Sequence, residues 1–403
     1  MSSTRTPAPA SAPAPAPAPA PAVAPGGPAA APTVFARPSA SGRCFNYSAG
    51  PGALPEEVLR QAQKDIWDIF DSGVGILEHS HRRPIFDRVL AEAEADFREV
   101  GGIPSDYSVM FLQGGASSQF HMIPMNFLAK DKSDTAGYFD TGEWSHKAIR
   151  EAKLFGNIHL CGDTSATKYD HVPKGSEVKY SPNAKYCYFE SNSTVYGIQF
   201  HQDPTPPPGV ELIVDACSDM FWKPVDVRKY ALYYAGAQKN LGPAGTVIVV
   251  ARRDFIEKGH KDLPWLLQYR TFDKEQSRPN TPATFGIYLV GQMIKWIKRQ
   301  GGLRAMEQLN RAKAGMVYDL LDSTDFYVAP ARKEDRSMMN VLFRCRTPEL
   351  DKQFCADAEK RGLDALAGHR STGGMRASLY NSMPIEGARA LVEFMKDFER
   401  RMR

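Results

Sequence analysis

The chain has 403 residues, of which 42% are hydrophobic and 24% charged, the balance of a globular protein long enough for two packed domains. Its formal net charge of +4 is too small to indicate a nucleic-acid partner, and no apolar run is long enough to span a membrane. The six cysteines form no CxxC pair, so no zinc site or secreted disulfide framework is predicted, and a reducing compartment is expected.

Residues 1–43 differ in composition from the rest of the chain. They are rich in proline and alanine and contain no aspartate or glutamate. Because proline fixes φ and lacks a backbone N–H, an extended or disordered tail is expected. Arg5, Arg37 and Arg43 leave an organelle transit peptide open, although the prolines disfavour the amphipathic helix that such a peptide needs. The expected location is the cytoplasm, with organelle targeting left open.

From Phe45 onward, helical patterns alternate with short β-rich runs. Apolar spacing near 3.6 predicts helices over residues 55–70 and 86–100. Strands are expected at residues 107–113, 135–140, 186–191, 211–216, 230–235 and 246–251. This alternation predicts an α/β fold with a mostly parallel sheet covered on both faces, a type of sheet that binds ligands at the carboxyl ends of its strands.

The order of elements changes after about residue 301. A helix over 303–322 precedes strands around 339–346 and 375–381, and a helix over 386–402 closes the chain. This order predicts a smaller α+β domain. The expected division is a tail (1–43), an N-terminal segment associated with the small domain (44–57), a large domain (58–300) and a small domain (301–403).

One lysine, Lys239, lies in the glycine-rich stretch AGAQKNLGPAG between two predicted strands. Its small neighbours leave room for a planar group to approach the backbone. A lysine amine forms an imine with an aldehyde once its pKa is lowered, and pyridoxal phosphate carries such an aldehyde. Taken alone, Lys239 is more simply a surface lysine in a turn, so its interpretation depends on the segments around it.

Two other strand ends carry suitable groups. Asp215 follows the apolar run ELIVD, and a buried carboxylate there would suit the pyridinium nitrogen of the cofactor, although it could also be a turn residue. Gly114 and Gly115 precede Ala116 and Ser117, which are predicted to open a helix whose free N–H groups bind phosphate. A Gly-Gly pair alone is weak evidence, because it is often only a turn.

Further candidates follow other strands and loops. Trp144 is placed to stack on the cofactor ring or to pack in the core, and Thr194 is placed to meet the ring hydroxyl or the phosphate. Asn280 and Thr281 supply donors on a proline-stiffened loop.

Two arginine-containing stretches are predicted to bind anions. HSHRRPIF contains His81 and Arg82; its His-x-His pair could bind a metal, but no third ligand is evident, and no metal is expected. ALAGHRSTGGMRASLYN contains His369, Arg370 and Arg376 in a glycine-rich loop before a strand. Forked guanidinium groups suit carboxylate or phosphate, and a solvated loop is the alternative.

The segments FNYSAGPGALPEEVL, SHRRPIF, AGAQKNLGPAG, RPNTPATF and GHRSTGGMRASLYN occur in this order along the chain. Together they resemble the phosphoserine aminotransferase family, within class V of the fold-type I pyridoxal-phosphate enzymes. The resemblance runs from about Phe45 to the C-terminus. It implies the fold-type I architecture, pyridoxal phosphate as cofactor and a homodimer with shared active sites.

The resemblance also implies a role for each candidate residue. Lys239 would hold the cofactor as a Schiff base and then move the proton between the substrate Cα and the cofactor C4′. The remaining cofactor residues would be Ala116, Ser117, Trp144, Thr194, Asp215, Gln238, Asn280 and Thr281. The substrate residues would be His81, Arg82, His369, Arg370 and Arg376. Arg82, Asn280 and Thr281 are expected to cross the dimer interface, and Ser117 stands where many members of the family carry an arginine.

The implied reaction converts 3-phosphohydroxypyruvate and L-glutamate to O-phospho-L-serine and 2-oxoglutarate in serine biosynthesis, with a side activity in pyridoxine biosynthesis left open. These small molecules are the expected partners, with neither nucleic acid nor membrane. The nearest alternatives are a class V aminotransferase for a small keto acid such as glyoxylate and a cysteine desulfurase. Cys345 lies in an expected strand and Cys355 in a helical pattern, so neither suits the mobile nucleophile of a desulfurase. A pyridoxal-phosphate protein without turnover is a third, regulatory alternative.

Overall fold

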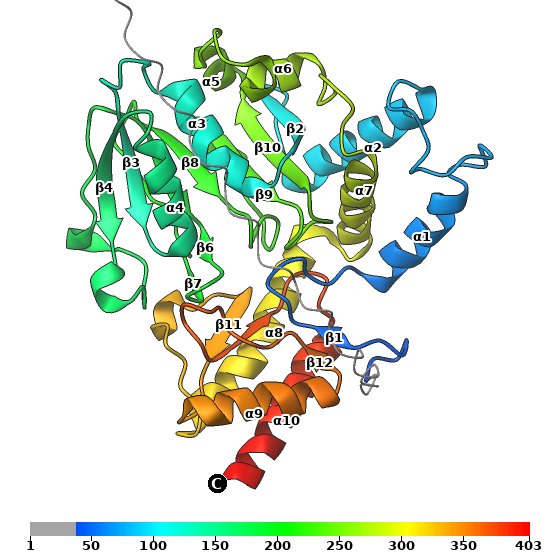
Figure 1. The fold of residues 1–403 in the computed structure, drawn as a ribbon, viewed down its shortest axis with the longest axis vertical. Coiled ribbons are helices and arrows are strands. Elements are labelled where there is room, and N and C mark those ends of the chain that lie inside the picture. The colour runs from blue at the N-terminus through cyan, green and yellow to red at the C-terminus, as the bar shows by residue number, and fades with distance from the viewer. Residues whose placement is uncertain (1–37) are drawn as a thin grey trace, which may run out of the picture. The chain divides into compact units, whose positions relative to one another are not determined.

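The computed structural model describes residues 38–403, so nearly all of the predicted tail lies outside the described residues (Figure 1). The helices are α1 (Glu56–Trp67), α2 (Pro84–Gly101), α3 (Gln119–Phe127), α4 (Glu143–Ala152), α5 (Arg253–Lys258), α6 (Tyr269–Lys274), α7 (Thr284–Arg299), α8 (Gly302–Ser323), α9 (Pro348–Lys360) and α10 (Ile385–Met402). None of the helices in the described part is long and apolar enough to cross a membrane.

The strands form one large and three small sheets. Their bounds are β1 (Phe45–Asn46), β2 (Tyr107–Gln113), β3 (Thr135–Asp140), β4 (Asn157–Asp163), β5 (Ala184–Glu190), β6 (Asn192–Ser193), β7 (Ile198–Gln199), β8 (Glu211–Asp215), β9 (Leu232–Gly236), β10 (Thr246–Arg252), β11 (Asn340–Phe343), β12 (Leu363–Asp364) and β13 (Met375–Ser378). The large sheet has the order β2-β10-β9-β8-β5-β3-β4.

All neighbours in the large sheet are parallel except for β10, which runs antiparallel to both β2 and β9. The predicted mostly parallel α/β sheet is therefore confirmed. The edge strand β4 was not predicted, because its sequence NIHLCGD mixes polar and apolar residues without a continuous apolar run.

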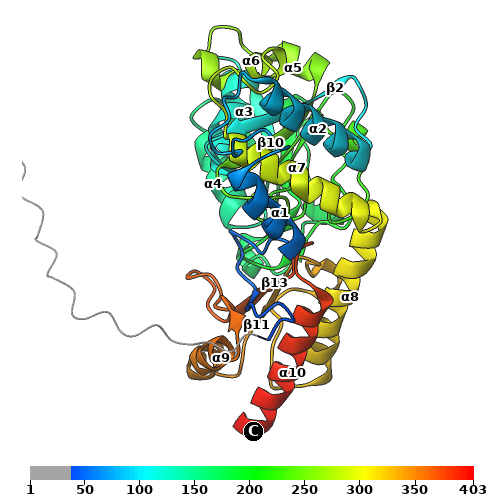
Figure 2. The same ribbon diagram turned by 90° about the vertical axis from the view of Figure 1, so that its right-hand side faces the viewer.

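Helices cover both faces of this sheet. On one face α3 and α4 pack Phe120, Ile123 and Ile149 against the strands, and both helices lie over the same face in Figure 1. On the other face α1, α2 and α7 pack apolar side chains such as Phe86 and Val290, and these three helices are seen together in Figure 2. Fully covered faces explain why the strands read as continuous apolar runs.

The C-terminal part has its own core. Strands β11 and β13 pair antiparallel, and side chains of α8, α9 and α10 pack with them, including Val317, Phe354 and Phe394. The N-terminal strand β1 pairs in parallel with β12, which places Phe45 in the same core. The first turns of α8 belong to the core of the large sheet instead, through Leu303. The boundary at residue 300 stays a prediction.

The first helix is shorter than predicted. It was expected to continue to Phe70 but ends at Trp67, and Asp68 adopts an extended conformation. Phe70 and Asp71 then take positive φ values of 57° and 55°, which are incompatible with a right-handed helix. The sequence DSGVG that follows is typical of a turn, and this turn signal ends the periodic pattern early.

Candidate active site

Lys239 lies in the turn between β9 and β10, at the carboxyl end of a central strand. Its Nζ atom donates a hydrogen bond of 2.9 Å to Oγ1 of Thr194 and lies 5.7 Å from the ring centroid of Trp144. Thr194 follows the short strand β6, and Trp144 is in the first turn of α4. Three residues predicted from separate segments therefore meet at one edge of the sheet.

The electrostatic environment of Lys239 differs from the sequence-based expectation of a lowered pKa. Burial lowers the pKa of the amine, but the nearby side chains of Tyr380, Cys217 and Asp215 raise it by more, so the net direction is upward. A carboxylate near the amine favours its protonated form.

Asp215 ends the buried strand β8 and is only 3% exposed. Its carboxylate accepts hydrogen bonds from the Tyr234 hydroxyl (2.8 Å), the Tyr188 hydroxyl (3.3 Å) and the Cys217 backbone N–H (2.9 Å). The Tyr188 hydroxyl is also 2.8 Å from the Tyr234 hydroxyl, so its single proton is shared between that oxygen and Asp215. Together these donors fix the orientation of the carboxylate. Tyr188 and Tyr234 were not predicted from the sequence, although both occupy positions in their strands that share a face with Asp215.

The glycine loop before α3 lies next to Gln238. Gly115 has φ = 77°, and residues Ala116–Ser118 form a turn of 3-10 helix, so the predicted α-helical start is displaced to Gln119. A Cβ added to Gly236 would lie 2.5 Å from Gln238 Oε1 and 3.2 Å from the Cβ of Ala116, so the strand end, Gln238 and the glycine loop are in close contact. Gln238 Oε1 is buried without a hydrogen-bond partner in the described chain, and Ser117 is exposed.

The C-terminal part contributes Arg376 on β13. Its Nη1 approaches the Thr194 carbonyl at 3.5 Å, and its Nε is buried with no hydrogen-bond partner among residues 38–403. Burial also lowers the pKa of this guanidinium below its ordinary value. A buried cation with an unused donor is a suitable group for a ligand carboxylate.

The loop before β13 also faces the start of α4. Burial and then the positive charge of Arg376 lower the pKa of His369. The positive charges of His369 and Arg370 contribute to the lowered pKa of Glu143, behind the larger effect of its bond to Lys147. Both predicted anion-binding residues of this loop therefore lie near the Lys239 edge of the sheet, with Arg370 exposed.

Four predicted residues do not join this group within one chain. The backbone carbonyl of His81 accepts from Arg278 at 3.4 Å, and the backbone N–H of Arg82 donates to Ser80. Asn280 and Thr281 are exposed and both accept hydrogen bonds from the side chain of Gln113, at 3.3 and 2.9 Å. No contact between these four residues and Lys239 is seen in the described structure.

The N-terminal segment SAGPG crosses the Lys239 turn, a contact that the sequence motif alone did not reveal. Gly52 N–H donates to the Gln238 carbonyl at 2.7 Å, and the Tyr380 hydroxyl donates to the Ala49 carbonyl at 2.7 Å. A Cβ at Gly52 would lie 2.7 Å from the Lys239 carbonyl oxygen. This close approach explains the glycine and links the N-terminal segment to both parts of the site. Lys239, together with Trp144, Thr194, Asp215, Gln238 and Arg376, forms the Lys239 centre.

A lysine at the end of a parallel strand, beside a buried aspartate and a tryptophan, defines the pyridoxal-phosphate class of enzymes that the fold also indicates. Residues 44–391 match the family model described as aminotransferase class-V. The chain is 45% identical to the phosphoserine aminotransferase of Lysinibacillus sphaericus over 360 residues, which is 89% of this chain and 99% of that protein.

Solved structures are similar over the same length. The phosphoserine aminotransferase from Bacillus circulans subsp. alkalophilus is 45% identical with a TM-score of 0.86, covering 89% of this chain and 99% of that chain. The pyridoxal-phosphate-bound phosphoserine aminotransferase from Trichomonas vaginalis is 36% identical with a TM-score of 0.84, covering 88% and 100%. The chain therefore belongs to the class V aminotransferase family and, within it, to the phosphoserine aminotransferases.

The residues present fit pyridoxal phosphate. The ionised Asp215 matches a cationic ring nitrogen, the Trp144 face matches a flat ring, and the Lys239 amine matches an aldehyde. Gln238 lies beside the glycine loop with its amide oxygen buried and without a partner, and the Nε2 donors of the same amide suit a phosphate. The described residues contain no group of three or more His, Cys, Asp or Glu side chains placed to hold a metal ion.

Proposed function

We propose that this protein is a pyridoxal-phosphate-dependent aminotransferase that converts 3-phosphohydroxypyruvate and L-glutamate to O-phospho-L-serine and 2-oxoglutarate. The observation that carries the proposal is the position of Lys239, whose amine donates to Thr194 and lies 5.7 Å from the centroid of the Trp144 ring. Lys239 follows β9, the strand that pairs with the Asp215 strand β8. Family membership supports the substrate assignment. The reaction belongs to serine biosynthesis, and we expect it to take place in the cytoplasm.

When bound, pyridoxal phosphate supplies an aldehyde that links to amines and a protonated ring that withdraws electrons from the substrate Cα. Lys239 would hold the aldehyde carbon and, once displaced by the substrate amine, would carry the proton between the substrate Cα and the cofactor C4′. Asp215 would hold the proton on the ring nitrogen, and Trp144 would keep the ring flat against the site. Ala116, Ser117 and Gln238 would bind the phosphate.

The substrate groups would bind on the side of the C-terminal part. Arg376 would hold the α-carboxylate through its unused Nε donor, close to the Thr194 carbonyl. His369 and Arg370 would bind the second anion, which is the phosphate of one substrate and the distal carboxylate of the other. One pocket would thus serve both half-reactions. This arrangement supports the proposed division into domains, with substrate bound between residues 58–300 and 301–403.

We further propose a homodimer in which Arg82, Asn280 and Thr281 complete the site of the other subunit, with His81 in the substrate pocket beside Arg82. Within one chain these residues have no contact with Lys239. The end of α1 and the connection from α1 to α2 expose apolar side chains, with Trp67 84% and Leu77 56% accessible. Such exposure is unusual for an isolated chain and supports a covering partner.

Turnover by the cofactor-loaded protein tests the proposed reaction. Glutamate with 3-phosphohydroxypyruvate should give O-phosphoserine and 2-oxoglutarate with ping-pong kinetics, at a kcat/KM at least about 100-fold above that for glyoxylate or pyruvate. Borohydride reduction followed by peptide mass spectrometry should locate the cofactor on Lys239. Faster turnover of glyoxylate would identify an aminotransferase for small keto acids instead. Loading without any turnover would indicate a regulatory cofactor protein.

A desulfurase is disfavoured by the positions of the two candidate thiols. Cys345 is buried directly after β11, and Cys355 lies within α9. Burial raises the pKa of Cys355 to about 11 and raises that of Cys345 further, so both thiols are protonated near neutral pH. Neither has the mobility or the thiolate character of a sulfur-transferring nucleophile. Release of sulfide from cysteine by the purified protein would contradict this assignment.

A further inference from the structure

Glu190 is a buried carboxyl group that none of the roles above uses. It is the last residue of β5, and it pairs in register with Asp215 on the neighbouring parallel strand β8. Residues paired in this way point to the same face of the sheet, and neighbouring strands are about 4.8 Å apart. Glu190 is 4% exposed and Asp215 is 3% exposed, so two carboxyl groups lie side by side under the candidate cofactor site.

The two carboxyl groups have different hydrogen-bonding environments. Asp215 accepts from the Tyr234 hydroxyl, from the Cys217 backbone N–H and, at 3.3 Å, from the Tyr188 hydroxyl, and such donors favour a carboxylate over a carboxylic acid. Glu190 is contacted by the backbone of Ser145, in the first turn of α4, and its Oε2 atom is buried without any partner in residues 38–403. An ionised carboxylate would not be stable with one oxygen unbonded at this depth.

Burial and the neighbouring carboxylates also favour the neutral form of Glu190. Burial, and then the negative charge of Asp215, raise the pKa of Glu190 well above its ordinary value, while Lys239 opposes this and Asp219 adds to it. The other titratable groups that face Glu190 are the hydroxyls of Tyr188 and Tyr196. Burial also raises the pKa of both tyrosines, so they contribute no charge near neutral pH.

We propose that Glu190 is a positioning residue that stands beside Asp215 as a neutral carboxylic acid, so that one negative charge and one proton donor face the ring of the bound cofactor. The proposal rests on the proposed cofactor site. A single carboxylate matches the single positive charge of a protonated ring nitrogen. A second carboxylate would instead favour a proton on Lys239 and hold its amine in the unreactive, charged form.

The cofactor-loaded protein and its Glu190→Gln and Glu190→Ala variants test this proposal. Glutamine keeps the shape and the neutral donor, whereas alanine removes both. Glu177→Gln is the matched control, because Glu177 is a half-exposed carboxylate bonded to His171, away from the Lys239 centre. Infrared spectra at pH 8 report the carbonyl stretch of a protonated carboxylic acid. Visible absorption against pH reports the proton on the bound cofactor linkage, and titration with cofactor gives its Kd.

We expect an acid band that disappears in Glu190→Gln and Glu190→Ala, persists in Glu177→Gln, and shifts in frequency when the cofactor is removed. A residue that only fills space would show no such shift. The pH midpoint of the visible spectrum should be the same in Glu190→Gln as in the unaltered protein. Glu190→Ala should raise the Kd of the cofactor by about tenfold or more, and Glu190→Gln should restore it.

Three results would overturn the proposal. The first is an infrared acid band that neither Glu190 substitution changes, and the second is an acid band that does not shift when the cofactor is removed. The third is a pH midpoint of the visible spectrum that falls by about 1–3 units in Glu190→Gln, as expected on loss of a charged carboxylate. Should Glu190→Gln fold poorly, Glu190→Ala still decides the infrared comparison. A protein that bound no cofactor at all would refute the proposed function, whereas normal loading and turnover with any of these three results would refute the role of Glu190 alone.

Discussion

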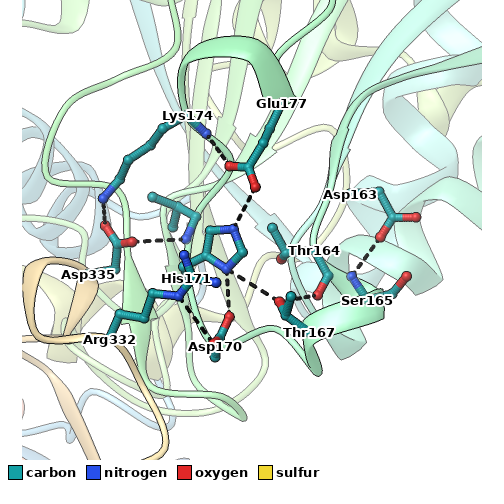
Figure 3. Close-up of polar contacts among 11 residues, drawn as sticks. Asp163, Thr164, Ser165, Thr167, Asp170, His171, Lys174, Glu177, Arg332 and Asp335 are labelled. Carbon is teal, nitrogen blue, oxygen red and sulfur yellow. Dashed lines mark hydrogen bonds and ion pairs between the residues drawn. The ribbon is translucent and has the colours of Figure 1, made fainter.

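The Lys239 centre can be compared with a second polar group, the His171 cluster, which also joins the large sheet to the C-terminal part. The His171 cluster consists of Asp170, His171, Lys174, Glu177, Arg332 and Asp335. Both ring nitrogens of the buried His171 are bonded, Nδ1 to Asp170 at 2.6 Å and Nε2 to Glu177 at 3.0 Å (Figure 3). The buried Asp335 pairs with Lys174 at 2.5 Å and accepts the Val172 N–H at 3.3 Å.

In the Lys239 centre, some buried polar atoms have no hydrogen-bond partner. Gln238 Oε1 and Arg376 Nε are buried there without partners in the described chain, and Glu190 beside them has the same deficit. Buried polar groups are almost always bonded, because leaving one unbonded costs about 1–3 kcal/mol. The two regions therefore differ in what completes them. The described chain bonds the six residues of the His171 cluster to one another, whereas the Lys239 centre keeps buried polar atoms that a bound ligand can meet.

The largest expected effect separates two lysines, one from each region. Lys239→Ala should lower kcat by about 10⁴-fold or more, because the residue that holds the cofactor and moves the proton is lost. Lys174→Ala should leave kcat within about twofold, because Lys174 bonds only to groups of the chain. The measurement is steady-state transamination by cofactor-saturated protein. Equal losses in the two variants would remove the distinction between the regions.

A smaller effect should distinguish the two arginines of the substrate side. Arg370→Ala should lower kcat/KM for 3-phosphohydroxypyruvate by about 10–100-fold, since a hydrogen bond to a charged group contributes about 1.5–3 kcal/mol. Turnover of an unphosphorylated keto acid should change little, so the ratio of the two rates is the readout. Arg376→Lys is the counterpart, because loss of the guanidinium fork should weaken both substrates alike. An unchanged ratio in Arg370→Ala would count against the phosphate assignment.

Residues of this site could be predicted where a strand end fixes their position, and could not be predicted where the order of the strands fixes it. Lys239 was identified from its glycine-rich stretch shortly after a predicted strand, and Asp215 from its place at the end of an apolar run. Parallel strands bring their carboxyl ends to one edge. Glu190 lies near the end of another predicted strand, but nothing in the sequence says that β5 lies next to β8. That neighbourhood depends on the crossover connections, so the carboxyl pair became visible only in the fold.

Residues on loops were less predictable still. Asn280 and Thr281 were assigned through the family resemblance, and in one chain they contact Gln113 rather than the Lys239 centre. The geometry of the 3-10 turn at Ala116–Ser118 also escaped the periodic pattern, because three residues are too few to show a period. Strand order, loop geometry and contacts between subunits depend on interactions between distant parts of the chain or between chains. Local sequence patterns therefore do not reveal them.

The His171 cluster should affect stability rather than turnover. Asp335→Ala should lower the free energy of unfolding by about 1–3 kcal/mol, because the Val172 N–H and the Lys174 amine lose their acceptor. The value of kcat/KM should stay within about twofold. Asp262→Ala is the control for loss of an exposed pair with Lys130, and its melting temperature should not change. Lost activity at normal stability would assign the cluster a role in catalysis.

An effect of similar size, seen only as a change of stability with pH, concerns Lys313, a fully buried lysine of α8. It donates to the backbone carbonyls of Tyr380 (2.6 Å) and Met383 (3.0 Å). Burial lowers its pKa from 10.5 to about 7. Between these two pH values the unfolded chain binds more protons at this site than the folded protein does, so stability must rise with pH across that window. The free energy of unfolding of the unaltered protein, relative to Lys313→Met, should therefore increase from pH 7 to pH 9 by about 1–3 kcal/mol. Denaturant unfolding at both pH values measures this difference, with the exposed Lys360→Met as the control that should show none. A pH-independent difference would mean that the two carbonyls keep Lys313 charged, and that the chain alone completes this site as fully as it completes the His171 cluster.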